Sequence, residues 1–351
     1  MEYYVIVNPG MEELAKQEIK ELIGVNSTCE HQAIFFQAIT EADVVQLILG
    51  SQSINQILAY IGDLDQVKKS KFNWNFFFQK GLTFKVEVIN VKGQDNRLAL
   101  ARQLVPVVIN EVSKNAGFSP EIKIKHPDIS LNLYFTGRRH IVGLDLVGKE
   151  LSGRDYRVFP HSASFKGDLA YFFVRKSGFK PGEKLLVGWM KDGTLPIEAA
   201  IYANRIFRDK EELAFSKFQW FKSSPNPLPS TGTKIYAFDE NRQNVIAAQK
   251  NAIIAQVKDL VFISRYSLDE LDVKYDQHQF DRLILQVTLK DEDKINEIYY
   301  QASYILKPKG TLLLIGRSKL DISISEKFKL IREEEISRGN SGYKILVLEK
   351  K

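Results

Sequence analysis

Basic residues form two short groups near the middle of the chain, and their chemistry is that of phosphate binding. The first group is Lys123, Lys125 and His126, and the second is Arg138, Arg139 and His140. Strand-like residues 129–134 and 140–146 are joined by Thr136-Gly137-Arg138-Arg139 as in a hairpin, and we expect this pairing to gather both groups into one positive rim. Such a rim neutralises several phosphates and binds in a salt-dependent manner. The alternative is a solvated strand edge whose charges protect against aggregation.

Other reactive residue types give no comparable constellation. The five histidines have no metal-ligand spacing, and no Walker-type phosphate loop occurs in the sequence. The only cysteine, Cys29, excludes an intramolecular disulfide and fits a reducing compartment. Because lone cysteines usually behave as small buried hydrophobes, we expect Cys29 in the core.

Length and composition indicate a folded protein of several domains. A chain of 351 residues with 44% hydrophobic residues can bury two or three cores. Its 49 Lys and Arg residues exceed 43 acidic residues, and the resulting charge of +6 favours a polyanionic partner such as nucleic acid. No signal-peptide pattern or apolar run of roughly 20 residues is present. We therefore expect a cytoplasmic protein without membrane contact.

The first 150 residues have the pattern of two α+β modules. Asp95 is expected to cap the long helix of the second module. Strands are predicted at 3–7, 33–38, 83–91, 122–125, 129–134 and 140–146, and helices at 11–23, 41–49, 54–61 and 95–111.

From Phe165 onward helices and strands alternate strictly. This pattern predicts an α/β domain with a mainly parallel sheet and helices on both faces. The segment Ser223–Gly232, rich in Pro, Ser and Thr, is expected to be an exposed loop, and 307–310 a turn. Helices are predicted at 165–177, 195–207, 240–254 and 291–304, and strands at 184–187, 234–238, 261–264, 282–286, 311–315 and 343–348.

Two segments of the second half resemble a known enzyme family. Residues 151–157 read LSGRDYR, and residues 185–200 read LLVGWMKDGTLPIEAA. These segments are similar to the domain junction and the cofactor motif of THUMP-domain RNA methyltransferases. This family includes large-subunit rRNA methyltransferase K/L and archaeal tRNA guanine-N2 methyltransferases. One departure in the junction is Asp155, which stands in place of the glycine of L-x-x-R-G-Y-R.

The resemblance implies a Rossmann-like methyltransferase fold preceded by ferredoxin-like and THUMP-like modules. The implied substrate is structured RNA, either tRNA or rRNA, methylated on a guanine exocyclic N2 with S-adenosylmethionine. Arg154 and Arg157 of the junction become further candidate RNA contacts. The implied parts are a ferredoxin-like domain at 1–62, a THUMP-like RNA-binding domain at 63–150, a linker at 151–164 and a methyltransferase domain at 165–351.

The cofactor motif is only partly retained. Val187 and Lys191 replace the family's acidic residue and first glycine, and we expect Lys191 to point to solvent. Asp239 stands where relatives bind the ribose hydroxyls, although it could equally cap the following helix. Ser267 stands where relatives bind the adenine. The residues that would still hold the cofactor are Gly193, Thr194, Glu198, Asp239 and Ser267.

The catalytic motif is lost. The family reads Asn-Pro-Pro-Tyr at the end of the fourth strand, whereas this chain reads Gln286, Val287, Thr288 and Leu289. No aromatic ring remains to stack on a flipped base. Gln286 offers an amide oxygen from a side chain one methylene longer, and a misplacement of about 1 Å can cost roughly a hundredfold in rate. We therefore assign no catalytic residue.

Three functions follow from these residues. The departures favour an RNA-binding pseudo-methyltransferase that presents, folds or protects RNA, or assists an active methyltransferase. The first alternative is a divergent S-adenosylmethionine-dependent RNA guanine-N2 methyltransferase that uses Gln286 and Asp239. The second alternative is a protein-interaction scaffold that binds no RNA.

Overall fold

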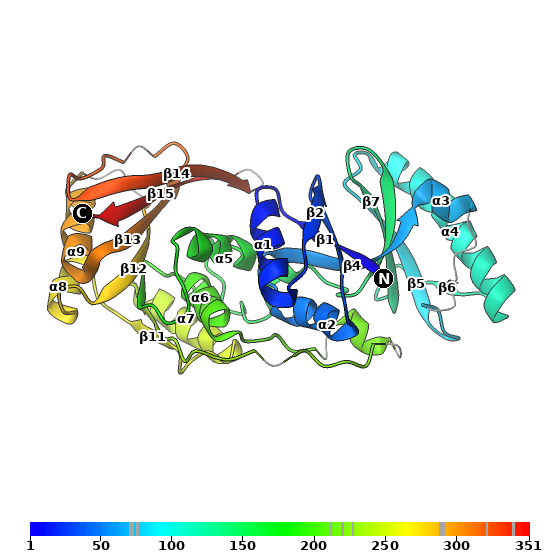
Figure 1. Cartoon of the computed structure of the whole chain (residues 1–351), viewed down its shortest axis with the longest axis horizontal. Helices are drawn as coiled ribbons and strands as arrows, with labels where there is room; N and C mark the ends of the chain where they lie inside the picture. The colour runs from blue at the N-terminus through cyan, green and yellow to red at the C-terminus, as the bar shows by residue number, and fades with distance from the viewer. Residues whose placement is uncertain are drawn as a thin grey trace. The chain divides into compact units, whose positions relative to one another are not determined.

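The computed structural model describes two compact units of the chain (Figure 1). The first comprises Met1–Leu151 with Arg208–Asn226, and the second comprises Ser152–Phe207 with Pro227–Lys351. The structure describes all residues except 70–73, 75–76, 211–212, 219–220, 227, 288–291, 321 and 339–340. No helix within the described residues is long and apolar enough to cross a membrane.

The first unit is built on an eight-stranded sheet with the order β2-β3-β1-β4-β8-β7-β5-β6. The sheet is continuous because β4 pairs with β1 on one side and with β8 on the other. The predicted ferredoxin-like and THUMP-like modules therefore share one sheet. Its strands are β1 (Glu2–Val7), β2 (Ser27–Glu30), β3 (Ala33–Gln37), β4 (Ile54–Asp63), β5 (Thr83–Ile89), β6 (Glu121–Ile122), β7 (Ile129–Phe135) and β8 (His140–Asp145).

The prediction of a helix at 54–61 is wrong, because these residues form β4. A short apolar run does not distinguish a buried strand from a buried helix, and here pairing on both edges decides for the strand. The other predicted helices of this unit are confirmed, although Gly93, and not Asp95, occupies the N-cap of the longest one. The helices are α1 (Glu12–Ile23), α2 (Glu41–Gly50), α3 (Leu64–Lys69) and α4 (Gln94–Ala116).

Cys29 is exposed, so its predicted place in the core is wrong. It lies on β2, the terminal strand of the sheet, which pairs with β3 alone. The side chain donates a hydrogen bond to the carbonyl oxygen of His31 at 2.8 Å. An edge strand has no neighbour to cover such a side chain.

The second unit contains a seven-stranded sheet with the order β11-β10-β9-β12-β13-β15-β14. The first five strands in this order are parallel, whereas β15 is antiparallel to both of its neighbours. The predicted doubly wound domain is thereby confirmed. Its strands are β9 (Leu185–Gly188), β10 (Ile235–Phe238), β11 (Val261–Ser264), β12 (Phe280–Gln286), β13 (Leu306–Arg317), β14 (Phe328–Arg338) and β15 (Ser341–Lys350).

Two features at the end of this sheet differ from the sequence prediction. The predicted turn at 307–310 belongs to β13, in which Lys309 has a left-handed backbone conformation. Strand β14 was not predicted, because it is a polar edge strand without a clear alternation of apolar residues. The helices of this unit are α5 (Gly167–Lys176), α6 (Thr194–Asn204), α7 (Arg242–Ile254), α8 (Leu271–Lys274) and α9 (Glu292–Ile305).

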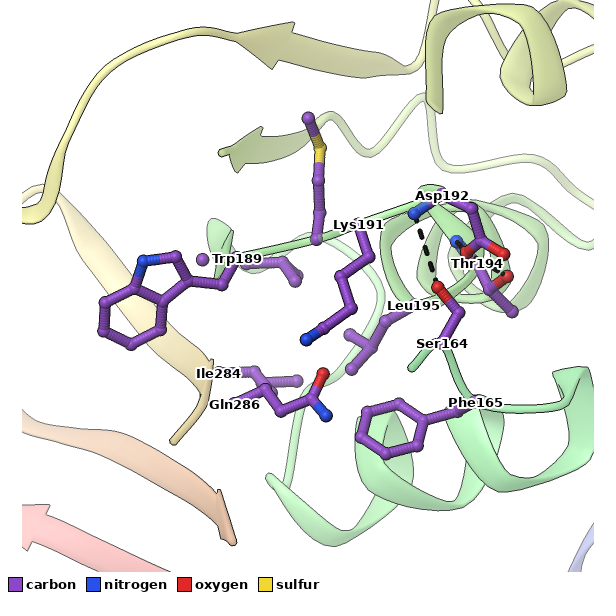
Figure 2. Close-up of a pocket in the computed structure, with 12 residues that line it drawn as sticks. Ser164, Phe165, Trp189, Lys191, Asp192, Thr194, Leu195, Ile284 and Gln286 are labelled. Carbon is purple, nitrogen blue, oxygen red and sulfur yellow. Dashed lines mark hydrogen bonds between the residues drawn. The ribbon is translucent and has the colours of Figure 1, made fainter. Parts of the chain in front are cut away.

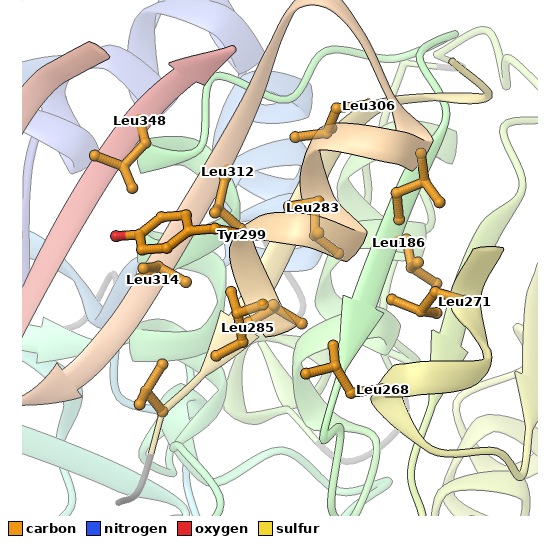
Figure 3. Packing of buried hydrophobic residues seen from close by; sticks show 14 of the residues in the cluster. Leu186, Leu268, Leu271, Leu283, Leu285, Tyr299, Leu306, Leu312, Leu314 and Leu348 are labelled. Carbon is orange, nitrogen blue, oxygen red and sulfur yellow. The ribbon is translucent and has the colours of Figure 1, made fainter. Parts of the chain in front are cut away.

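A leucine-rich core fixes the central strands of this sheet. Leu186, Leu283, Leu285 and Leu312 from three parallel strands pack beside Tyr299 of α9 (Figure 3). Strands buried on both faces read as continuous apolar runs. This packing places the carboxyl ends of β9, β10 and β12 at one edge of the sheet. The strand order reverses between β9 and β12, which is where doubly wound folds bind their ligands.

Candidate functional site

The turn after β9 forms the centre of the candidate site. Trp189, Lys191 and Gly193 all have left-handed backbone conformations, with φ angles of 51°, 55° and 81°. This conformation is rare for residues with a side chain and favours glycine. A Cβ atom on Gly188 would lie 2.3 Å from Leu285 and 2.6 Å from Phe238, so only glycine fits there. The backbone of this turn therefore has the conformation of a glycine-rich turn, although Trp189 and Lys191 carry side chains there.

The backbone amides of this turn are used within the protein. Lys191 N donates to Asp239 Oδ2 at 3.0 Å, and Asp192 N donates to Ser164 Oγ at 3.4 Å. Gly193 N donates to the Met190 carbonyl at 2.9 Å. Thr194 N and its hydroxyl both donate to Asp192 Oδ1. These groups are therefore not presented to a ligand.

Side chains from the same turn fill the space beneath it. Figure 2 shows Lys191 running between Trp189 and Leu195 toward Gln286. The free space here is about 10 Å³, which is roughly the room needed for one water molecule. The prediction that Lys191 points to solvent is wrong. Burial lowers the pKa of its ammonium group, an effect that the Asp239 carboxylate opposes.

A larger cavity of about 160 Å³ adjoins this space. It lies at the carboxyl ends of β9, β10 and β12. Its volume is below the roughly 300–1,000 Å³ typical of small-molecule sites. Its polar and aromatic lining includes His161, Trp189, Lys191, Asp239, Glu240, Asn244, Gln286 and Lys294.

Asp239 lies at the predicted place, but its oxygens are already engaged. Oδ2 accepts from Lys191 N, and Oδ1 accepts from Asn241 N at 2.9 Å and from Asn244 Nδ2 at 3.0 Å. The N-cap of α7 is Asn241, so the alternative prediction that Asp239 caps this helix is wrong. Asp239 instead joins the turn after β9 to the loop after β10.

The other residues predicted to contact the cofactor do not lie together around one cavity. The Ser267 hydroxyl donates to Glu270 Oε2, and the described lining of the larger cavity does not include Ser267. Glu198 is fully buried and accepts from Arg154 Nε at 2.7 Å, Arg154 Nη2 at 2.9 Å and Tyr156 OH at 2.6 Å. Thr194 lines the small pocket, with its hydroxyl turned to Asp192. Glu198 therefore has a structural role.

The predicted catalytic segment is described only in part. Gln286 ends β12, and its side chain lines both cavities. Val287 is buried and lines the larger cavity. Thr288 and Leu289 lie outside the described residues.

The junction arginines are not surface residues. The Arg154 side chain is 6% exposed and forms the two hydrogen bonds to Glu198 described above. The Arg157 side chain is 14% exposed, with Nη2 at 3.0 Å from Asp192 Oδ2. Buried guanidinium groups paired in this way do not reach RNA, so the predicted contacts are corrected to internal ion pairs. Nothing local in the sequence links residues 154 and 198.

The two basic groups of the first unit lie at opposite ends of β7. Lys123, Lys125 and His126 are exposed and precede the start of this strand, whereas Arg138 is exposed in the turn after its end. A strand of seven residues is about 20 Å long, so the predicted single rim is wrong. Lys92, which the sequence did not single out, follows β5 at the same end as Arg138, because β5 and β7 are parallel.

The second basic group is also partly neutralised. Arg139 donates to Glu30 Oε2 and to Asp63 Oδ1, each at 2.8 Å, and hydrogen bonds from Arg139 lower the pKa of Glu30. His140 packs against the Phe135 ring at 4.8 Å, and burial lowers its pKa. Among these predicted contacts, Lys123, Lys125, His126 and Arg138 therefore remain available to a polyanion.

The sheet order and the site at the carboxyl ends define a Rossmann-like methyltransferase fold. Solved structures of similar fold include a putative methyltransferase complexed with SAH, at a TM-score of 0.79 and 17% identity over 100% of this chain and 98% of that one. TrmN from Thermus thermophilus is also similar, at a TM-score of 0.69 and 16% identity over 100% and 99% of the two chains.

Residues 154–311 match the model of the family described as RMKL-like, methyltransferase domain. Over 286 residues the chain is 24% identical to a tRNA (guanine(6)-N2)-methyltransferase of Archaeoglobus fulgidus, covering 78% of this chain and 71% of that protein. It is also 24% identical to a ribosomal RNA large subunit methyltransferase K/L of Photobacterium profundum, covering 77% of this chain and 41% of that protein. The predicted family resemblance is confirmed, whereas the THUMP assignment stays a prediction.

The residues present do not fit the S-adenosylmethionine that this family implies. The amides of the turn are closed on internal acceptors, and the space beneath the turn holds about 10 Å³. The Lys191 ammonium group also enters the site of a cofactor that carries a positive sulfonium. Like charges repel most strongly where water is excluded.

Proposed function

We propose that this protein binds structured RNA, tRNA or rRNA, and that its methyltransferase domain is catalytically degenerate. The degenerate domain is inferred from the turn after β9. There the Lys191 side chain lies in the small pocket, and the backbone amides form hydrogen bonds within the protein. The choice of RNA rests on the names of the two relatives, which act on tRNA and ribosomal RNA.

The RNA-binding surface that we propose is the loop before β7. Lys123, Lys125 and His126 are exposed there, and none of them forms an ion pair with another described residue. The neighbouring carboxylate of Asp128 accepts hydrogen bonds from Thr83 and lies 3.6 Å from Lys217. The loop therefore presents uncompensated positive charge, which would neutralise phosphates and release counterions.

Charge reversal at the two ends of β7 tests this surface. We expect Lys123→Glu with Lys125→Glu to weaken tRNA binding and to reduce the salt slope by about 1 for each phosphate that is no longer neutralised. Arg138→Glu is the matched variant at the other end, and we expect it to change affinity less. Fluorescence anisotropy at low and moderate salt measures both. Equal affinity of the double variant and the natural protein would refute this surface.

Cofactor titration tests the degenerate pocket. We expect no heat of binding when the purified protein is titrated with S-adenosylmethionine or S-adenosylhomocysteine. Binding at micromolar concentration would contradict the proposal. Absence of any RNA binding at low salt would instead favour a protein-interaction scaffold.

A divergent RNA guanine-N2 methyltransferase is the second candidate. The relatives are named as methyltransferases, and the left-handed path of the turn and Asp239 are retained. On this hypothesis the turn rearranges when cofactor enters, and Gln286 accepts a hydrogen bond from the guanine amino group. Transfer of a labelled methyl group from S-adenosylmethionine to tRNA, abolished in Gln286→Ala, would establish it.

A further inference from the structure

Two polar side chains that line the larger cavity form no hydrogen bond with another described residue. Lys191 from the turn after β9 and Gln286 at the end of β12 line this cavity as well as the small pocket, and Figure 2 shows the two side chains close together in the small pocket. Within the described residues no acceptor lies within hydrogen-bond distance of the Lys191 ammonium group, and the Gln286 amide forms no hydrogen bond. Both groups offer N–H donors to the same space.

The carboxylates that face Lys191 are engaged elsewhere. Asp239 accepts three N–H groups, and Asp192 accepts from Arg157, His161 N and Thr194. Glu240 accepts from the Trp189 indole at 3.1 Å. These acidic groups therefore compensate the Lys191 ammonium only in part.

Further positive charge surrounds this ammonium group. Lys294 from α9 lines the same cavity and lies 4.7 Å from the Trp189 ring centre. Burial lowers the pKa of Lys191, Asp239 and Asp192 raise it, and Arg317 at the end of β13 lowers it. An anion that entered the cavity would meet the donors of Lys191 and Gln286 and lie near the positive charge of Lys294.

The size and lining of the cavity limit the anion to a small group. A volume of about 160 Å³ is close to the roughly 150 Å³ cavity that holds one benzene molecule. This volume has room for a phosphate group and part of a sugar, and the rest of such a ligand would lie at the mouth of the cavity. Trp189, Asn244 and Gln286 add a ring and amide groups, which suit a nucleoside.

We infer that Lys191 makes this cavity an anion site and that its ligand is the phosphate group of a nucleotide. The nucleotide is either a free nucleoside monophosphate or the terminal nucleotide of an RNA. In both cases Lys191 Nζ and Gln286 donate to phosphate oxygens. The inference uses the pocket of the proposed function but does not depend on RNA binding by the first unit.

Calorimetric titration of the full chain with adenosine 5′-monophosphate and with adenosine tests the site. We expect the monophosphate to bind more tightly than adenosine and inorganic phosphate to compete with it. Lys191→Met keeps an unbranched side chain that is one atom shorter and removes the charge, and we expect it to weaken monophosphate binding at least about tenfold. The affinity for adenosine should stay the same.

Lys309→Met is the matched control. Lys309 also has a left-handed backbone conformation, with φ of 62°, but it is exposed at the start of β13, the opposite end from the cavity. We expect it to bind the monophosphate like the natural protein. Equal affinity for monophosphate and adenosine, or unchanged binding in Lys191→Met, would overturn the inference. If Lys191→Met does not fold, competition by inorganic phosphate in the natural protein decides the inference. Competition upholds the anion site, and its absence overturns it.

Two oligonucleotides that differ only in a 5′-phosphate distinguish the sources. Tighter binding of the phosphorylated oligonucleotide than of the unphosphorylated one assigns the site to an RNA end. Equal binding of the two oligonucleotides, together with tight binding of the free monophosphate, assigns it to a free nucleotide. Either result upholds the anion site. Binding of S-adenosylmethionine in a parallel titration would refute the degenerate pocket of the proposed function. The comparison of monophosphate with adenosine would still decide this inference.

Discussion

Two buried carboxylates of this protein have different electrostatic surroundings. Asp145 in the first unit is fully buried, and its Oδ1 accepts from the backbone amides of Val147 and Gly148. Burial raises its pKa to about 6, and the two amides oppose this effect. Glu198 in the second unit is equally buried but is held by the guanidinium group of Arg154. Different stability effects follow from these surroundings.

Asp145 should make stability depend on pH. Its pKa in the folded protein is about 6, above the roughly 3.9 of an unfolded chain, so the folded state binds more protons between these values. The free energy of unfolding therefore falls as pH rises from about 4 to 6, by up to about 3 kcal/mol. Asp145→Asn removes this effect. We expect urea unfolding to show a larger relative gain for the variant at pH 7 than at pH 4.5, and an equal difference at both would contradict the assignment.

Loss of Glu198 should leave the Arg154 charge buried without its main carboxylate. We expect Glu198→Ala to reduce the free energy of unfolding by about 3–5 kcal/mol, and Glu198→Gln by less, because the amide still accepts a hydrogen bond. Denaturant unfolding measures both. Glu13→Ala, which breaks an exposed pair with Lys16, is the control and should cost at most about 1 kcal/mol. A similar small loss for Glu198→Ala would refute the structural role.

At the scale of elements, the turn after β9 depends on the close approach of three strands. Gly188 pairs with Phe238 of β10 and with Leu285 of β12 in the parallel sheet. The side chains of these two neighbours occupy the space that a Cβ atom would need. The position of Lys191 in the cavity is therefore set by packing below the turn.

Gly188→Ala should disturb this arrangement. We expect a loss of about 1–3 kcal/mol in stability from overpacking against Leu285 and Phe238. Gly153→Ala, in the same unit, has open space around the added Cβ and should be nearly neutral. Thermal unfolding of the two variants compares them directly. Equal melting temperatures would show that the turn adjusts without cost.

At the scale of the whole molecule, the chain passes between its two units more than once. Arg208–Asn226 lies between two segments of the second unit in sequence but belongs to the first unit. Arg208 Nη1 donates to the Ile48 carbonyl at 3.0 Å, and Nη2 donates to the Ser51 carbonyl. This side chain thus satisfies carbonyl groups at the end of α2.

Arg208→Ala should loosen this attachment. Loss of charge-assisted hydrogen bonds costs about 1.5–3 kcal/mol, so we expect faster hydrogen exchange near the end of α2 and in 208–226. Hydrogen-exchange mass spectrometry measures this. Lys210→Ala, at an exposed position of the same segment, serves as the control and should leave exchange unchanged. Unchanged exchange in Arg208→Ala would contradict the anchoring role.

The sequence by itself determined the α/β class of the second unit and the family resemblance, because both rest on local patterns. Alternating helices and strands require only the periodicity of apolar residues, and the IEAA segment after Gly193-Thr194 is contiguous. The departure from the Asn-Pro-Pro-Tyr motif at Gln286 is a prediction that rests on an equally local comparison. These features need no knowledge of distant contacts.

Only the tertiary structure decided the roles of single charged residues, since their partners lie far away in sequence. Arg154 and Glu198 meet across 44 positions, and Arg139 meets Glu30 across 109. The length of β7, about 20 Å, separates the two basic groups, although a strand at 129–134 is predicted from the sequence. The direction of Lys191 depended on the packing of three strands. Long-range contacts of this kind set electrostatics and exposure, and a single sequence does not encode them locally.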